Sequence, residues 1–174
     1  ILGYAYPRIP VKEAKRDRLL TLIYDNYYFD MYALSVIKQS KYYHHIDLID
    51  ANGDRITAYA THMFCLYTNM STHSDDLILL EAMMNGCVPV THRDVPGIRF
   101  KTTGVKILKP FMNQVYEIEI PDVNEIDNAI DIALSLSREE IEDLREKAKE
   151  YAKRKYVYGL EEFIRTITSL RVSP

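Results

Sequence analysis

The feature that most constrains the fold is the alternation of short β-type apolar runs with segments of helical periodicity. The β-type runs cover residues 1–6, 19–24, 45–51, 63–69, 87–92 and 105–108, and the helical segments cover 25–40 and 74–86. The runs are apolar at consecutive positions, as strands buried on both faces are. Strand and helix in repetition predict a parallel sheet with helices on both faces.

From Asp122 onward the pattern is helical alone. Three segments follow one another, 122–137, 138–156 and 160–170. In the second of them acidic residues occupy the first turns and basic residues the last turns, as the helix dipole favours. Because no linker or repeat interrupts the chain, residues 1–174 are expected to form one α/β domain that ends in a helical segment.

Composition excludes several classes of protein. The formal net charge of −3 gives no general attraction to phosphate backbones, so nucleic acid is not an expected partner. No apolar run approaches the roughly 20 residues of a membrane span and the amino terminus lacks a signal pattern, so no integral membrane span is expected. Cys65 and Cys87 lie in strand-like runs and are expected to be buried thiols, which fits a cytoplasmic protein.

The stretch THSDDLILLEAMMNGCVPVTH, residues 72–92, places a carboxylate, Glu81, inside a nearly all-apolar helix. Ser74 or Thr72 can cap this helix, and Gly86 can end it in the left-handed conformation. A buried ionised carboxylate is costly unless it meets hydrogen-bond donors. Glu81 therefore pairs with a Lys or Arg, lies on a helix face that reaches solvent, or faces a ligand.

A family resemblance adds to this interpretation. LLEAMMNGCVPVTH, residues 79–92, resembles the signature of the carboxyl-terminal, donor-binding domain of GT-B fold glycosyltransferases of family 4. The matching positions are Glu81, Ala82, Met83, Gly86, Pro89 and Val90. The downstream order also resembles the family, with a loop at Pro96–Gly97, a Thr-Gly pair at 103–104 and a helix at 125–130. The resemblance covers residues 45 to about 170 and implies a Rossmann-like lobe.

The resemblance implies that a nucleotide-diphosphate sugar lies at the carboxyl ends of the strands. By the same resemblance, Glu81 holds the ribose hydroxyls, while Arg8 and Lys12 neutralise the diphosphate as it leaves, an electrostatic contribution that usually dominates catalysis. For the basic segment that carries Arg8 and Lys12, a solvated helix start is the alternative. Further donor-binding positions are expected at the strand ends: Ser74, His92 and Gly97.

The chain departs from the family pattern where a first glutamate usually stands, eight positions before the second. His73 occupies this position and can still donate to a sugar hydroxyl or a phosphate. Asp75 and Asp76 replace the glycines that follow, at a helix amino terminus. There they either compete with a diphosphate for the helix dipole or serve as first-turn partners of that dipole.

The expected function is the donor-binding half of a glycosyltransferase that transfers a sugar to a glycan, lipid or protein acceptor. The family implies retention of configuration and no bound metal or other cofactor, and the five histidines lack the spacing of a metal site. A general base is expected on a second lobe or partner subunit, and a chain that begins at Ile1 fits a part of such a protein. The alternative is a non-catalytic, Rossmann-like binding or regulatory module whose site has drifted.

Overall fold

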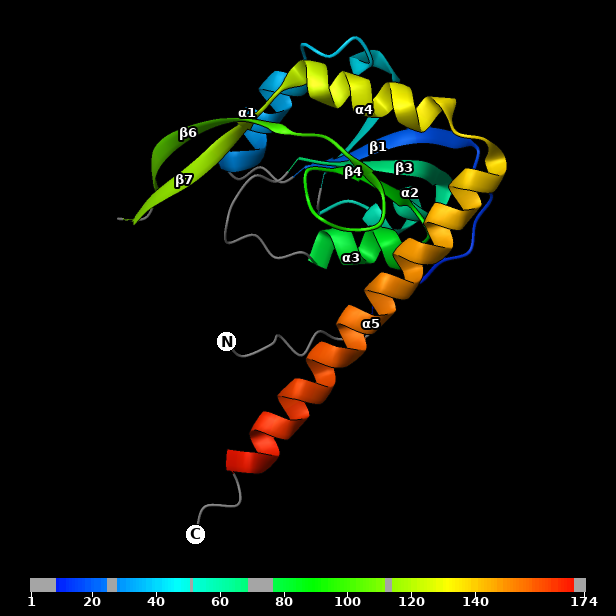
Figure 1. Cartoon of the computed structure of the whole chain (residues 1–174), viewed down its shortest axis with the longest axis vertical. Helices are drawn as coiled ribbons and strands as arrows, with labels where there is room; N and C mark the ends of the chain where they lie inside the picture. The colour runs from blue at the N-terminus through cyan, green and yellow to red at the C-terminus, as the bar shows by residue number, and fades with distance from the viewer. Residues whose placement is uncertain (1–8, 25–27, 51, 69–76, 112–113, 171–174) are drawn as a thin grey trace.

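The computed structural model describes residues 9–24, 28–50, 52–68, 77–111 and 114–170 (Figure 1). Its centre is a five-stranded sheet in the spatial order β2-β1-β3-β4-β5, and every neighbouring pair is parallel. The strands are β1 (Arg18–Tyr24), β2 (Ile46–Asp50), β3 (His62–Tyr67), β4 (Val88–Thr91) and β5 (Ile98–Arg99). This architecture confirms the predicted Rossmann-like parallel sheet. The strand expected at residues 1–6 lies outside the described residues.

Helices cover both faces of this sheet (Figure 1). On one face, α1 (Tyr28–Ile37) and α4 (Val123–Ser135) pack on alternate strand residues such as Leu22, Phe64 and Val90. On the other face, α2 (Arg55–Thr61) and α3 (Leu77–Met84) pack on Ile23 and Cys65. The consecutive apolar positions of the strands are therefore explained, because neighbouring residues point into two different helical layers.

The helix α3 is buried as predicted, between the sheet and a further helix. Leu79 and Met83 pack against Ala148 and Ala152 of α5 (Arg138–Leu170). Gly86 ends this segment with a φ of 72°, which confirms the predicted left-handed residue. Cys65 and Cys87 are free and buried, so both thiols belong to the core as expected. Burial raises the pKa of Cys87 well above its ordinary value.

Residues 105–108 form a strand as predicted, but the expectation that this strand belongs to the parallel sheet is wrong. These residues belong to β6 (Thr102–Phe111), which pairs antiparallel with β7 (Gln114–Pro121) in a separate hairpin. A β-type apolar run indicates a strand but does not specify its partner, and an antiparallel partner close in sequence needs only a short turn. The hairpin contacts α1 beside the main sheet (Figure 1).

The carboxyl-terminal helices are also joined differently from the prediction. The segments 138–156 and 160–170 form the single helix α5 of 33 residues. Gly159, between them, costs a helix only about 1 kcal/mol relative to alanine, so one glycine does not break it. The helix runs from the sheet layer away from the body of the fold (Figure 1). Among the described residues, no helix is long and apolar enough to cross a membrane.

Candidate functional site

The carboxyl edge of the sheet is where an open α/β fold binds ligands, at the point where the strand order reverses. In the order β2-β1-β3-β4-β5 this point lies between β1 and β3. Arg8, His73 and Ser74, three of the expected site residues, lie outside the described residues. Of the remaining expected positions, the structure places Lys12 and Glu81 beside α2, and His92 and Gly97 in the segment that follows β4.

Glu81 forms a two-pronged ion pair with Arg55, the first residue of α2. Arg55 Nε lies 2.6 Å from Oε2 and Nη2 lies 3.0 Å from Oε1. The Glu81 side chain is only 6% exposed, against 34% for Arg55. The hydrogen bonds to Glu81 are the main reason that the pKa of Arg55 is raised. The pair matches one alternative that the sequence offered for Glu81, and its role toward ribose stays a prediction.

Lys12 contacts the same turn of α2. Its backbone N–H donates to Asn85 Oδ1 over 2.9 Å, and its Nζ donates to Thr57 Oγ1 over 2.6 Å. Asp54, the amino-terminal cap of α2, accepts from the Thr57 N–H. The bonds from Thr57 hold the pKa of Asp54 below its ordinary value, and the charge of Lys12 adds to this effect. The first turn of α2 therefore collects Lys12, Asp54 and the Arg55–Glu81 pair.

His92 lines a separate pocket of about 330 Å³ at the carboxyl ends of β4 and β5. The other lining residues are Arg99, Phe100, Lys101, Thr102 and Glu119. His92 Nδ1 is buried and has no hydrogen-bond partner among the described residues. Burial and the charge of Arg93 lower the pKa of His92 to about 4, so its imidazole is neutral at neutral pH. An open pocket lined by charged and polar side chains is able to accept a polar ligand.

Two cationic side chains give this pocket its charge. Arg99 is 64% exposed and its Nη1 lies 3.5 Å from Asp94 Oδ1, a loose surface pair. Lys101 is exposed and lies two residues after the end of β5. Opposite them, Glu119 of β7 accepts a hydrogen bond from Thr102 Oγ1 over 2.9 Å. Cations for an anionic group and a carboxylate for hydroxyl groups thus line one cavity.

Gly97 has a packing reason for its identity. A Cβ added to this residue would lie 2.3 Å from the backbone oxygen of Pro89 in β4, a distance that real Cβ atoms do not adopt. The loop after β4 therefore needs a glycine to pass close to the strand. Whether Gly97 also approaches a donor stays a prediction.

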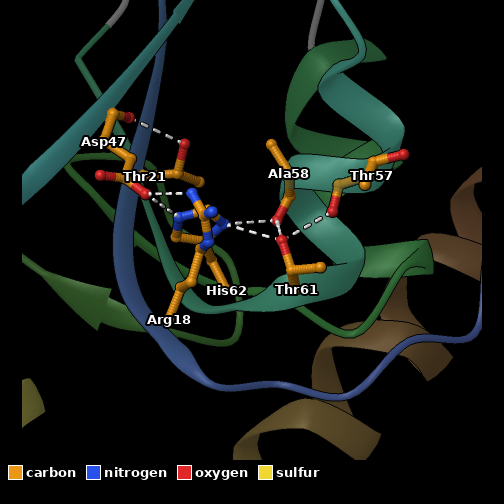
Figure 2. A network of polar contacts seen from close by, with 7 residues as sticks. All are labelled: Arg18, Thr21, Asp47, Thr57, Ala58, Thr61 and His62. Carbon is orange, nitrogen blue, oxygen red and sulfur yellow. Dashed lines mark hydrogen bonds and ion pairs between the residues drawn. The ribbon is translucent and has the colours of Figure 1, made fainter.

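A polar network at the amino edge of the sheet contains an Asp, a His and a Thr, residue types that also occur together in catalytic sites (Figure 2). His62 is 2% exposed, and its Nε2 lies 3.0 Å from Asp47 Oδ2 while its Nδ1 lies 2.7 Å from Ala58 O. Thr61 Oγ1 lies 3.2 Å from Nδ1, but its hydroxyl also lies 2.8 Å from Thr57 O, as in a helical back-bond. Because Nδ1 faces a carbonyl that only accepts, it carries a proton and cannot act as a base toward Thr61. The network ties β2, β3 and α2 together.

Three of the pocket's charged residues were missed from the sequence: Arg99, Lys101 and Glu119. Arg55, the partner of Glu81, was missed as well, since α2 is only seven residues long. Its signal is the Asn-Gly-Asp turn before it, in which Asp54 caps a helix. Among the described residues, no group of three or more His, Cys, Asp or Glu side chains could hold a metal ion.

No family model matches the chain, and no curated protein matches it either. The likeness to glycosyltransferases therefore depends on residues 79–92 and on the order of segments after them.

Proposed function

We propose that the chain is the donor-binding half of a GT-B type glycosyltransferase and that it holds a nucleotide-diphosphate sugar at the carboxyl edge of its sheet. The observation that carries the proposal is the pocket of about 330 Å³ beyond β4 and β5, lined by His92, Arg99 and Lys101. The pocket lies at the carboxyl edge of the sheet, the edge at which parallel sheets bind nucleotides, but beyond β4 and β5 and not at the switch point between β1 and β3. Its side chains suit a phosphorylated sugar.

Each lining group has a chemical task in this proposal. Arg99 and Lys101 bind phosphate oxygens, because charge-assisted hydrogen bonds to phosphate are among the strongest that side chains make. Glu119 accepts hydrogen bonds from sugar hydroxyls, as a carboxylate does. His92 is neutral at neutral pH and forms part of the pocket wall. Compensation of the charge on the leaving diphosphate is the catalytic contribution of these cations.

Glu81 is the proposed ribose ligand. Arg55 occupies one position on each of its carboxylate oxygens, at 2.6 and 3.0 Å. Each oxygen has a further lone-pair site, so the carboxylate keeps capacity for two hydroxyl donors. Arg55 then orients Glu81 for the ligand as well as compensating its charge. Lys12, whose Nζ lies 2.6 Å from Thr57 Oγ1, is a phosphate ligand in this proposal.

The acceptor in this proposal is a glycan, lipid or protein, bound by a second lobe or a partner subunit. Transfer proceeds with retention and needs no bound metal. The two free thiols, Cys65 and Cys87, suit a reducing compartment such as the cytoplasm.

Calorimetric titration of the chain with UDP-, GDP- and ADP-sugars tests the proposal. We expect one donor to bind, and we expect Arg99→Ala combined with Lys101→Ala to weaken it by at least about tenfold, since charged hydrogen bonds contribute about 1.5 to 3 kcal/mol each. The matched control is Lys153→Ala with Arg154→Ala on α5, which removes two positive charges that do not line the pocket. The proposal is contradicted if none of the nucleotide sugars binds, or if the pocket variant binds the donor as tightly as the wild type does.

A non-catalytic binding module is the second candidate. The observation that favours it is the engagement of both Glu81 oxygens by Arg55, which explains the buried carboxylate without any ligand. Donor turnover separates the two candidates. Release of free sugar or its transfer to an acceptor supports the enzyme, while tight binding without turnover in the presence of the second lobe supports the module.

A further inference from the structure

A second and larger pocket, of about 620 Å³, opens at the amino edge of the sheet, opposite the proposed donor site. Its apolar wall is formed by Ala14, by Met63 of β3 and by Ile141 of α5. Met63 and Ile141 also pack against the main hydrophobic core, so this wall is continuous with rigid structure. A preformed concavity of this size is typical of small-molecule sites.

The charged lining of this pocket is mostly cationic. Lys15, Arg16, Arg138 and Arg145 line it together with one carboxylate, Glu142. Glu142 is already paired with Arg145 Nη1. Lys15 and Arg138 are exposed and have no ion-pair or hydrogen-bond partner among the described residues. The pocket therefore has an excess of positive charge that the described part of the chain does not neutralise.

Two guanidinium groups lie close together at the back of the pocket. A Cβ placed on Gly86 would lie 2.8 Å from Arg16 Nη2 and 3.3 Å from Arg145 Nη2. Arg16 is held by the backbone oxygens of Tyr59 and His62, at 2.7 and 2.8 Å. Burial, and then the charge of Arg145, lower the pKa of Arg16. A bound anion would relieve the repulsion between these two like charges.

Arg145 lines the cavity, and only part of its guanidinium is paired among the described residues. Its Nε donates to Gly86 O over 3.1 Å and its Nη1 donates to Glu142, which fixes the plane of the guanidinium. Its Nη2 has no acceptor among the described residues. At the amino terminus of α5, Ser137 and Glu140 bond each other's backbone N–H in a capping box.

We propose that this pocket binds a small organic phosphate monoester, with its phosphate among Lys15, Arg138 and Arg145 and its apolar body on Met63 and Ile141. Three cations with free donors suit the dianion of a phosphate monoester better than the single charge of a carboxylate, and an arginine fork binds two phosphate oxygens at once. The apolar wall selects for an ester over inorganic phosphate, because only the ester buries apolar surface. This inference does not depend on the proposed function.

Phenyl phosphate is the probe for the test, with inorganic phosphate and phenol as its two halves. Calorimetry on the chain should show saturable binding of phenyl phosphate that is tighter than that of either half. Lys15→Ala with Arg138→Ala should weaken it by at least about tenfold, because two charge-assisted bonds are lost. Both side chains are exposed, so the variant should fold, and its unfolding transition is measured alongside.

Two controls make the result specific to the pocket. Lys153→Ala with Arg154→Ala on α5 should leave phenyl phosphate binding unchanged. Methyl NMR should show a saturable shift of the Met63 resonance, assigned with Met63→Leu. Absence of binding, equal loss in the control variant, or a Met63 methyl that does not respond would overturn the proposal.

Discussion

The two edges of the parallel sheet differ in how their buried polar groups are satisfied. At the amino edge, Arg16 donates to carbonyl oxygens at the ends of two helices, and His62 bonds both Asp47 and Ala58. At the carboxyl edge, His92 has a buried Nδ1 without a partner among the described residues. A buried polar group whose hydrogen bonds are all made stabilises the fold. A buried polar group without a partner gains free energy when it forms a hydrogen bond.

The same contrast separates one buried charged residue from two exposed ones. Glu81 is nearly fully buried yet both its oxygens meet Arg55. The cations Arg99 and Lys101 are exposed, and Arg99 has only a loose pair with Asp94. Burial alone therefore does not identify a binding residue in this chain. The state of the hydrogen-bonding groups around the residue is more informative.

The largest effect is expected from Arg16→Ala at the amino edge. The substitution removes a charged donor from the backbone oxygens of Tyr59, His62 and Asn85. Each orphaned carbonyl costs roughly 1 to 3 kcal/mol, so the free energy of unfolding should fall by about 4 kcal/mol or more. Urea denaturation followed by circular dichroism measures it.

Arg18→Ala is the matched control for this substitution. Arg18 is 60% exposed and pairs with Asp47 at 2.8 Å, a surface ion pair that contributes at most about 1 kcal/mol. Equal losses in the two variants would show that Arg16 does not hold the helix ends, and the contrast between the edges would lose its strongest element.

Much of the fold could be predicted, because a strand that is buried on both faces has apolar residues at consecutive positions. Strands β1, β2, β3 and β4 of the parallel sheet lie at the runs predicted for 19–24, 45–51, 63–69 and 87–92. The short elements α2 and β5 were missed, because seven and two residues are too few to show a period. The hairpin β6–β7 was missed because a β-type run predicts a strand but not the strand with which it pairs.

The site was less predictable than the fold. A single sequence showed that Glu81 needs a donor, but its partner Arg55 stands 26 positions earlier and only the packing of α2 on α3 brings them together. His92 was predicted because it ends a strand, and it lines the pocket beyond β4 and β5; its role toward a ligand stays a prediction. Arg99 and Lys101 were missed, since an exposed cation in sequence has the same appearance whether it faces water or a pocket.

The Arg55–Glu81 pair should show an asymmetric response to substitution. Arg55→Ala leaves a carboxylate that is 6% exposed without a partner, and the free energy of unfolding should fall by about 3 kcal/mol. Glu81→Ala leaves a guanidinium that is 34% exposed and still hydrated, so the loss should be smaller, about 1 to 2 kcal/mol. A double-mutant cycle measures the coupling; a reversed order of the two losses would place the buried charge on Arg55 instead.

A smaller effect is expected from the titration of His92. Burial lowers its pKa from 6.5 to about 4, so between these pH values the unfolded chain binds a proton that the folded chain does not. The free energy of unfolding should therefore fall as the pH drops through this window, by roughly 1 to 2 kcal/mol after allowance for partial exposure. Urea unfolding of the wild type and of His92→Gln across the window measures it. Parallel curves for the two proteins would contradict the prediction.

The smallest effect on stability is expected where the effect on binding is largest. Arg99→Ala and Lys101→Ala remove exposed cations, so each should change the free energy of unfolding by no more than about 0.5 kcal/mol. If the pocket beyond β5 binds the phosphates of a nucleotide-diphosphate sugar, the same variants should weaken the binding of that sugar. Urea denaturation and calorimetry on one preparation measure both quantities.

The pairing of these two quantities distinguishes a binding edge from a structural edge. A residue that holds the fold loses stability and affinity together, as Arg16 should, because an unfolded chain binds nothing. A residue kept for a ligand loses affinity alone, because in the free protein it is already solvated and costs nothing to remove. If Arg99→Ala lowers the free energy of unfolding by about 2 kcal/mol or more, side chains at the carboxyl edge stabilise the fold as those at the amino edge do. The contrast between the two edges would then be one of degree, and the unpartnered Nδ1 of His92 would be its remaining basis.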